Sequence, residues 1–303
     1  MHVFHFRPGA LALVLCSAMI AGSGQAKDKL PRPTMADLVK ASTAADWRPL
    51  DSENTLYLDV PQGRVVIELA PNFAPKHAAN IKALVREHYF DGLTILRSQD
   101  NYVVQWGDAD GKKEIKTAKK TLPEEFTVKY AASLPFTRLP DADGYAPQTG
   151  IANGFPAGRD PKTGRAWLAH CYGMVGAGRD NDADSGGGAE LYVVTGHAPR
   201  HLDRNVTLVG RVMQGIELLS SLPRGTGPLG FYEKPEQQVP IKAIRVAADV
   251  PEAERTRLEV IRTDTPTYKA IVDAQRNRGG DWYKYAAGYI ELCNVPIVVR
   301  AQK

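Results

Sequence analysis

The sequence predicts a mostly β protein whose central part is a closed antiparallel barrel covered by two helices. Two observations lead to this fold class. Apolar residues alternate with other residues in several short stretches separated by turns rich in glycine, aspartate and asparagine, and only two stretches of the central region have helical periodicity. Closure is favoured because a barrel made of many short strands leaves no strand edge exposed.

The composition excludes several classes of protein. The chain has 303 residues, of which 43% are hydrophobic and 24% are charged, so a disordered chain and a fibrous repeat are excluded. The formal net charge is +4, from 38 basic and 34 acidic residues that are mixed along the chain. Since no basic arm or patch stands out, nucleic acid is not expected as the main partner.

The first 26 residues are typical of a secretory signal peptide. Basic residues precede an apolar run over residues 10–22, and the small-x-small sequence Gly24-Gln25-Ala26 follows, so cleavage is expected after Ala26. The alternative is a membrane anchor, but the run is shorter than the roughly 20 apolar residues of a spanning helix. Lipidation at Cys16 is disfavoured because Leu15 stands where a small residue is expected. The mature protein is therefore expected in the periplasm or outside the cell, and not in a membrane.

Signal cleavage would leave two cysteines, Cys171 and Cys293, in a compartment where disulfides persist. One Cys171–Cys293 bridge is compatible with this count. Two buried free thiols that pack as small apolar side chains are equally compatible. The sequence leaves both alternatives open.

The barrel region begins after a polar, proline-containing lead-in at residues 27–53, which has one short amphipathic patch at residues 35–45. Apolar alternation starts in residues 56–60, stops at the turn sequence Pro61-Gln62-Gly63 and resumes in residues 65–69. Two strands joined by a tight turn are therefore predicted.

Helical spacing of apolar residues predicts one helix over residues 74–87, with Pro75 suited to its first turn, and a second over residues 214–222. One apolar side of the first helix should cover the barrel. Further short strands are predicted at residues 93–97, 102–105, 172–177, 191–195, 207–212 and 241–246.

Two regions have no obvious place in the barrel. Residues 109–168 carry little periodic signal and include a glycine- and proline-rich piece at residues 141–164, so a long loop inserted into the domain of residues 54–250 is predicted. Residues 251–303 are predicted to form a C-terminal α/β extension, mostly helical over residues 251–278 and with one strand over residues 289–299.

Four blocks of the sequence carry a resemblance to a known family. They are VVIELAPNFAPKHAANIKALVREHYFDG, ILRSQDNYVVQWGD, YGMVGAGRDNDADSGGGAELYVVT and HLDRNVTLVGRVMQGIELL. Their order and spacing resemble the cyclophilin family of peptidyl-prolyl isomerases from about residue 54 to residue 248. The resemblance implies an eight-stranded antiparallel barrel capped by two helices. It also implies that the proline-binding groove lies outside the barrel, because side chains fill the interior of a small barrel.

The chemistry of that family requires neither a nucleophile nor a metal, and no cofactor is expected. Rotation about an X-Pro amide must break its resonance, which gives a barrier of about 20 kcal/mol. A hydrogen-bond donor aimed at the proline nitrogen stabilises the twisted state, and an apolar pocket anchors the ring. The resemblance implies that Arg97 is this donor and that Gln105 holds the substrate backbone.

The resemblance also implies a set of substrate-binding residues. They are Tyr102, Val103, Glu190, Tyr192, His201 and Leu202. Most of them form an apolar cup with aromatic walls. Some replace the usual family residue: both tyrosines stand where phenylalanine is usual, and His201 stands where tryptophan is usual.

Other departures bear on how well the site would act. Leu96 precedes Arg97 where the family has histidine, Arg179 stands at an asparagine position and Val206 at a histidine position. Altered peptide binding and weak catalysis are therefore expected.

No metal site is predicted. The acidic run Asp180-x-Asp182-x-Asp184 resembles a calcium loop, but Ser185 occupies the position where the turn needs glycine. His197 and His201 are four residues apart, yet Pro199 between them argues against a helical metal pair.

The sequence leaves three functions open. The first is a prolyl isomerase that assists the folding of exported proteins and binds their proline-containing segments. The second is a cyclophilin-like chaperone or assembly factor that binds such segments with weak or no turnover. A third possibility assigns the main role to the inserted loop and the C-terminal extension.

Overall fold

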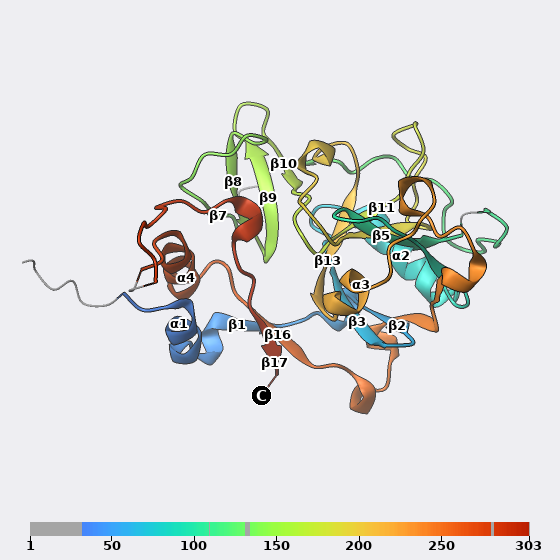
Figure 1. Cartoon of the computed structure of the whole chain (residues 1–303), viewed down its shortest axis with the longest axis horizontal. Coiled ribbons are helices and arrows are strands. Elements are labelled where there is room, and N and C mark those ends of the chain that lie inside the picture. The colour runs from blue at the N-terminus through green and yellow to red at the C-terminus, as the bar shows by residue number, and fades with distance from the viewer. Residues whose placement is uncertain (1–31, 109, 131–133, 280–281, 303) are drawn as a thin grey trace, which may run out of the picture. The chain divides into compact units, whose positions relative to one another are not determined.

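We describe the protein with a computed structural model, which defines residues 32–108, 110–130, 134–279 and 282–302 (Figure 1). The predicted signal peptide at residues 1–26 lies outside these ranges. Among the helices within them, none is both long enough and apolar enough to cross a membrane.

The central sheet has nine antiparallel strands in the order β14-β4-β5-β12-β11-β13-β3-β2-β15. The strands are β2 (Thr55–Val60), β3 (Gly63–Leu69), β4 (Thr94–Ser98), β5 (Val103–Gly107), β11 (Met174–Ala177), β12 (Leu191–Val194), β13 (Leu208–Gln214), β14 (Val239–Pro240) and β15 (Ala243–Val246). Val60 pairs with Gly63 across a two-residue turn, which confirms the predicted hairpin.

The mostly β class is confirmed, but the closed eight-stranded barrel is not. The sheet curls, and its end strands β14 and β15 do not pair with one another. Strand β14 is only two residues long and ends at Pro240, which has no N–H to donate. Residues 241 and 242 then connect the two end strands. Ile241 N donates to Leu93 O (2.8 Å) beside β4, and Lys242 N donates to Asp59 O (2.9 Å) in β2.

Two helices pack against the apolar core of this sheet, as predicted. They are α2 (Pro75–Arg86) and α3 (Ile216–Ser220). Ile81 and Leu84 of α2 and Leu219 of α3 are fully buried in the same cluster as Trp106 of β5. Burial of these large side chains is the main favourable contribution to the packing of helix on sheet.

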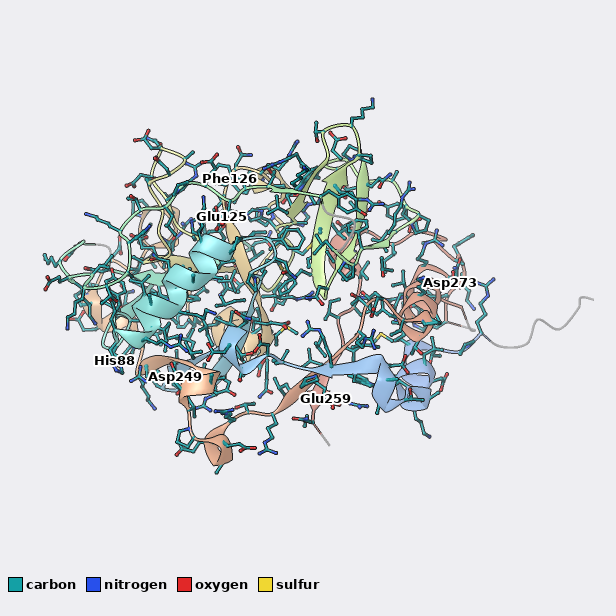
Figure 2. The ribbon with its side chains drawn as sticks, turned by 180° about the vertical axis from the view of Figure 1, so that it is seen from behind. His88, Glu125, Phe126, Asp249, Glu259 and Asp273 are labelled. Carbon is teal, nitrogen blue, oxygen red and sulfur yellow. A yellow bond between two sulfur atoms is a disulfide. The ribbon has the colours of Figure 1, made fainter. Side chains whose placement is uncertain are left out.

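The N-terminus of α2 is stabilised from outside the helix. Its N-cap residue, Ala74, has no side chain that can accept a hydrogen bond. Instead the Glu125 carboxylate accepts from the backbone N–H groups of Lys76 (3.0 Å) and His77 (2.9 Å), and it lies 2.8 Å from His77 Nδ1. Figure 2 shows Glu125 at one end of α2 and His88 near the other.

The region predicted as a long loop, residues 109–168, instead contains a second antiparallel sheet with the order β6-β10-β9-β8-β7. Its strands are β6 (Val128–Lys129), β7 (Thr137–Arg138), β8 (Gln148–Ala152), β9 (Phe155–Asp160) and β10 (Arg165–Leu168). Two of the glycines that suggested a loop, Gly150 of β8 and Gly158 of β9, lie within these strands and permit close packing. A Cβ atom on Gly158 would lie 2.7 Å from the indole of Trp167.

The lead-in and the C-terminal extension form one unit together. Strand β16 (Leu258–Ile261) pairs with both β1 (Trp47–Pro49) and β17 (Val299–Ala301), and α1 (Met35–Ala41) packs against α4 (Pro266–Arg276). Of residues 251–278, which were predicted to be mostly helical, α4 is helical, whereas residues 258–261 form strand β16 instead. The strand predicted over residues 289–299 is wrong except at Val299, where β17 begins; Leu292–Asn294 form a 3₁₀ turn instead.

Short 3₁₀ helices complete the structure. They are η1 (Ala44–Asp46), η2 (Ser52–Asn54), η3 (Arg200–Leu202), η4 (Pro228–Gly230), η5 (Pro235–Gln237), η6 (Ala247–Asp249), η7 (Glu252–Glu254) and η8 (Leu292–Asn294).

A second apolar core and a disulfide join the lead-in, the insertion and the C-terminal extension. The core contains Trp47 of β1, Ile151 of β8 and Tyr268 of α4. Of the two alternatives for the cysteines, the structure has the disulfide: Cys171 Sγ and Cys293 Sγ are 2.04 Å apart. The bond connects the residues that follow the insertion with the C-terminal extension.

Candidate active site

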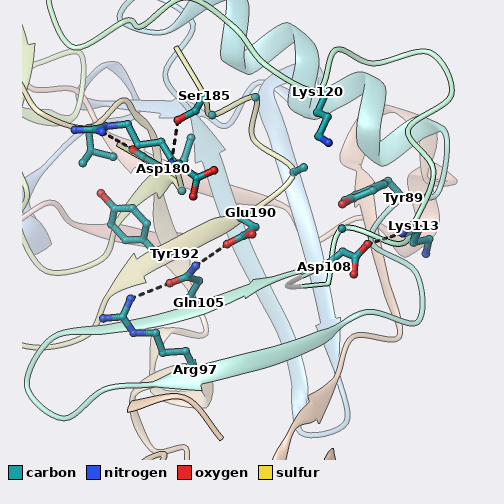
Figure 3. Close-up of a pocket in the computed structure, with 18 of the residues that line it drawn as sticks. Tyr89, Arg97, Gln105, Asp108, Lys113, Lys120, Asp180, Ser185, Glu190 and Tyr192 are labelled. Atoms are coloured by element: carbon teal, nitrogen blue, oxygen red, sulfur yellow. Dashed lines mark hydrogen bonds between the residues drawn. The ribbon is translucent and has the colours of Figure 1, made fainter. Parts of the chain in front are cut away.

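Three neighbouring strands of the central sheet place the predicted site residues in one row. Arg97 of β4 pairs with Gln105 of β5, and Gln105 pairs with Tyr192 of β12. Directly opposed residues of adjacent strands point to the same face of a sheet. All three side chains therefore line one pocket, whose volume is about 1110 Å³ (Figure 3).

The Arg97 guanidinium is half-buried and held by three acceptors. Nε donates to Leu229 O (2.7 Å), Nη1 donates to Gln105 Oε1 (3.0 Å), and Nη2 donates to Gln99 Oε1. The guanidinium carbon also lies 5.7 Å from the ring centroid of Tyr102 and 5.4 Å from that of Phe231. Burial lowers the pKa of Arg97, but an arginine side chain stays protonated in proteins. The pocket thus contains a fixed positive charge with further N–H groups to donate.

Gln105 is oriented by a carboxylate. Its Nε2 donates to Glu190 Oε2 over 2.8 Å, while its Oε1 accepts from Arg97. Burial raises the pKa of Glu190, and the nearby charges of Asp180 and Asp108 add to this effect. Because an ionised carboxylate can only accept, Glu190 determines which end of the Gln105 amide faces Arg97.

The apolar part of the pocket is formed by most of the predicted binding residues. Val103 and Tyr192 are buried in one small cluster, against which Tyr102 and Val206 pack. Leu202 also lines the pocket. These side chains give the pocket an apolar wall near the Arg97 guanidinium.

The opposite end of the pocket is polar and is built partly from the insertion. It contains Asp108 and Lys113, which Figure 3 shows joined by a hydrogen bond, together with Tyr89 and Lys120. A peptide that extends beyond the apolar part would therefore meet charged side chains.

Residues 55–246 match the family model described as cyclophilin type peptidyl-prolyl cis-trans isomerase/CLD. The chain belongs to this family. The crystal structure of cyclophilin AquaCyp293 from Hirschia baltica is similar to it, with a TM-score of 0.67 and 27% sequence identity, over 85% of this chain and 94% of that chain. The similarity to AquaCyp293 therefore extends beyond the cyclophilin domain itself.

Similarity to curated cyclophilin-family proteins is more local. A protein of Brucella suis named "Probable peptidyl-prolyl cis-trans isomerase" is 45% identical over 58 residues, which are 19% of this chain and 30% of the relative. A protein of Rhizopus delemar named "Peptidyl-prolyl cis-trans isomerase-like 2" is 23% identical over 234 residues, 73% of this chain and 36% of the relative. This chain thus spans about a third of the length of these relatives.

One predicted binding residue of the cyclophilin domain lies elsewhere. His201 is exposed and is not among the residues that line the pocket. It belongs to η3, a tight turn in which the next residue, Leu202, faces the pocket and the preceding residue, Arg200, is buried. Successive residues of such a turn point in different directions, so only one of the three lines the pocket.

Sequence analysis missed a segment of the cyclophilin domain that covers Arg97. Gly225 N donates to Ser98 O (2.9 Å) and Tyr232 N donates to Leu96 O (3.0 Å), so residues 225–232 run along β4. This segment supplies Leu229 O and the Phe231 ring to the site. Its only sequence signal is an aromatic residue in a glycine- and proline-rich connection, which is too general to assign a site.

Proposed function

We propose that this cyclophilin is a peptidyl-prolyl cis-trans isomerase that assists the folding of exported proteins by binding their proline-containing segments. The observation that carries the proposal is the position of the Arg97 guanidinium, fixed between Gln105 and two aromatic rings at the edge of an apolar pocket. The prolyl ring would occupy the apolar part, next to Tyr102, Val103 and Tyr192.

In this mechanism Arg97 donates a hydrogen bond to the proline nitrogen as the amide twists. The twisted nitrogen has a free lone pair, whereas the planar amide nitrogen does not, so the interaction favours the transition state over the ground state. One charge-assisted hydrogen bond contributes about 1.5–3 kcal/mol, roughly ten- to a hundredfold in rate. Burial of the ring and positioning of the backbone by Gln105 would contribute the rest.

The test is the cis-to-trans rate of a proline tetrapeptide set with varied residues before proline. The full-length chain, Arg97→Ala and Arg97→Lys are compared, and Arg262→Ala serves as a control because Arg262 lies in an exposed ion pair. We expect acceleration by the wild type and the control, and a loss on the order of ten- to a hundredfold in Arg97→Ala. Equal rates for the wild type and Arg97→Ala would overturn the role of Arg97.

A second candidate function has its own support. Three acceptors, Leu229 O, Gln105 Oε1 and Gln99 Oε1, already engage Arg97, which reduces its capacity to donate to a substrate. A chaperone or assembly factor that binds proline segments without turnover would tolerate this. Peptide binding by the wild type without acceleration of isomerisation would favour this second function.

The export part of the proposal rests on the signal-like residues 1–26 and on the Cys171–Cys293 disulfide, which persists in oxidising compartments. Expression in a Gram-negative bacterium followed by fractionation and N-terminal sequencing tests it. The expected result is a periplasmic protein that begins at Lys27. An uncleaved chain in the cytoplasmic fraction would contradict export.

A further inference from the structure

A chain of buried polar side chains leads away from one wall of the pocket. The Tyr192 hydroxyl lies 2.9 Å from His170 Nε2, and His170 Nδ1 lies 3.0 Å from Asp203 Oδ1. Asp203 Oδ2 then accepts from Arg200 Nε over 2.6 Å. All four residues are buried, and His170 is completely inaccessible to solvent.

The proton positions in this chain follow from the partners of His170. The Asp203 carboxylate can only accept hydrogen bonds. Its Oδ1 accepts one from the His170 backbone N–H (2.9 Å) and lies beside His170 Nδ1, so Nδ1 must carry the hydrogen of that second bond. Burial lowers the pKa of His170, which keeps the ring neutral near pH 7. His170 Nε2 is then an acceptor, and the Tyr192 hydroxyl donates to it.

The far end of the chain is anchored on the insertion and on the C-terminal extension. Arg200 Nη1 and Nη2 donate to the two carboxylate oxygens of Asp143 over 3.0 and 3.1 Å, and Nη1 lies 3.6 Å from Glu291 Oε1. Asp143 belongs to the insertion and Glu291 to the extension. The disulfide joins the same parts, because Cys171 follows His170 and Cys293 lies two residues after Glu291.

Tyr192 depends on this support to stay in the wall. Its ring rests against the backbone of the opposed residue Gly176, where a Cβ atom would lie 2.2 Å from Tyr192 Cζ. A buried hydroxyl without a partner is strongly unfavourable. Without His170, the ring is therefore expected to leave Gly176 and turn into the pocket, where its hydroxyl reaches water and the ring occupies the place of a prolyl ring.

We propose that His170 is a positioning residue that holds Tyr192 against Gly176 and thereby keeps the proline pocket open. The insertion and the C-terminal extension act on substrate affinity through Asp203 and Arg200. This inference rests on the proposed function, since it takes the pocket to be the site of the prolyl ring.

The experiment is a double-mutant cycle in the full-length chain with His170→Leu, Tyr192→Phe and the double variant. The Kd for a proline tetrapeptide and the kcat and KM for its isomerisation are measured. His170→Leu should raise Kd and KM on the order of tenfold with a smaller change in kcat, because the buried phenol loses its acceptor. Tyr192→Phe should change Kd by less than about threefold, because the ring stays and no hydroxyl needs a partner.

The double variant decides between positioning and mere structural support. It removes both the hydroxyl and its acceptor, so its Kd should return to within about threefold of that of Tyr192→Phe. If the double variant binds as weakly as His170→Leu, or if His170→Leu binds as tightly as the wild type, the proposal is overturned.

A second pair of variants tests the distant anchor. Asp143→Asn keeps the size of the side chain but weakens the contact with Arg200, and Kd should rise by roughly two- to fivefold. Asp160→Asn is the matched control, because Asp160 is a residue of the same insertion whose bonds to Lys162 and Thr163 are local. Equal Kd values for the two variants would overturn the role of the insertion.

Failure of the proposed function can be distinguished from failure of this inference. Should the wild type bind peptide without accelerating isomerisation, only the isomerase proposal fails. The Kd values of the double-mutant cycle then still test whether His170 positions Tyr192. Should it bind no peptide, the pocket assignment fails, and a crystal structure of His170→Leu then decides whether Tyr192 has left Gly176. A Tyr192 ring unmoved in that structure would overturn the positioning role.

Discussion

The side-chain amide of Gln105 donates a hydrogen bond to the Glu190 carboxylate over 2.8 Å. A glutamine amide can be turned end for end at little cost unless its neighbours distinguish oxygen from nitrogen. Here Glu190 accepts on one side and Arg97 donates on the other, so only one orientation satisfies both contacts. Glu190 is therefore part of the machinery that orients Arg97, although it does not touch the guanidinium.

Replacing Glu190 should separate the need for an acceptor from the need for a charge. Glu190→Leu frees the Gln105 amide, and kcat/KM for tetrapeptide isomerisation should fall by about tenfold, the equivalent of one hydrogen bond. Glu190→Gln retains an acceptor oxygen and should stay within about threefold of the wild type. Equal losses in the two variants would show that the charge matters and the acceptor does not.

The gain in stability from Glu190→Gln over the wild type should depend on pH. Burial raises the pKa of Glu190 above its ordinary value of 4.5, so ionisation costs the native state more than the unfolded state. This cost is absent below the unfolded-state pKa and appears as the pH rises through the native-state pKa. Urea unfolding should therefore find the variant more stable than the wild type at pH 8, with a difference that shrinks toward pH 4. A pH-independent difference, or the same profile in the exposed control Glu236→Gln, would contradict this.

Phe231 should contribute to substrate affinity through the segment that covers Arg97. Its ring lines the pocket and lies 5.4 Å from the guanidinium carbon. Phe231→Ala removes both the apolar surface and the contact with the cation, and KM should rise by roughly five- to twentyfold. Tyr285→Ala, at a ring that is 93% exposed, is the control and should leave KM unchanged. An unchanged KM in Phe231→Ala would exclude residues 225–232 from the site.

Glu125 should stabilise the whole domain, because it takes the place of an N-cap for α2. Glu125→Ala leaves the N–H groups of Lys76 and His77 without their acceptor, and the free energy of unfolding should fall by about 1–2 kcal/mol. Chemical denaturation measures the loss. Glu124→Ala, at the exposed neighbouring residue, should change stability by less than about 0.5 kcal/mol. A loss of the same size in both variants would remove the special role of Glu125.

The disulfide should be a large contributor to stability, because Cys171 and Cys293 are 122 residues apart in the chain. Cys171→Ala/Cys293→Ala should lower the free energy of unfolding by about 2–5 kcal/mol, as expected for the loss of a constraint on a long loop. Dithiothreitol should destabilise the wild type by a similar amount and leave the double variant unaffected. A wild type that is insensitive to the reductant under unfolding conditions would contradict the prediction.

Sequence patterns were most informative for strands that are close in the sequence and pair with one another in the sheet. Alternation over β2 and β3 predicted the hairpin, and the blocks around Arg97 and Gln105 predicted two residues that the structure brings into hydrogen-bond contact. The first result depends on short-range rules of strand geometry. The second depends on the resemblance of these blocks to the cyclophilin family.

The parts that could not be predicted depend on long-range contacts. Strands β8 and β9 contain Gly150 and Gly158, whose missing side chains suggest a loop until the aromatic rings that pack on them are known. In the same way, Phe231 reaches Arg97 across more than a hundred residues of sequence, and no local pattern encodes that approach. His201 was predicted to line the site but lies outside it for another reason. One step along a tight 3₁₀ turn changes the direction in which a side chain points.

The pairing of β1 with β16 has a consequence for synthesis of the chain. β1 precedes the cyclophilin domain and β16 follows it, so about 200 residues must be made before β1 meets its neighbour. A ribosome-bound chain would therefore expose α1 and β1 as an unpartnered, amphipathic segment while the central sheet is already complete. The three-stranded sheet β1-β16-β17 is therefore the last sheet of the fold that can form during synthesis.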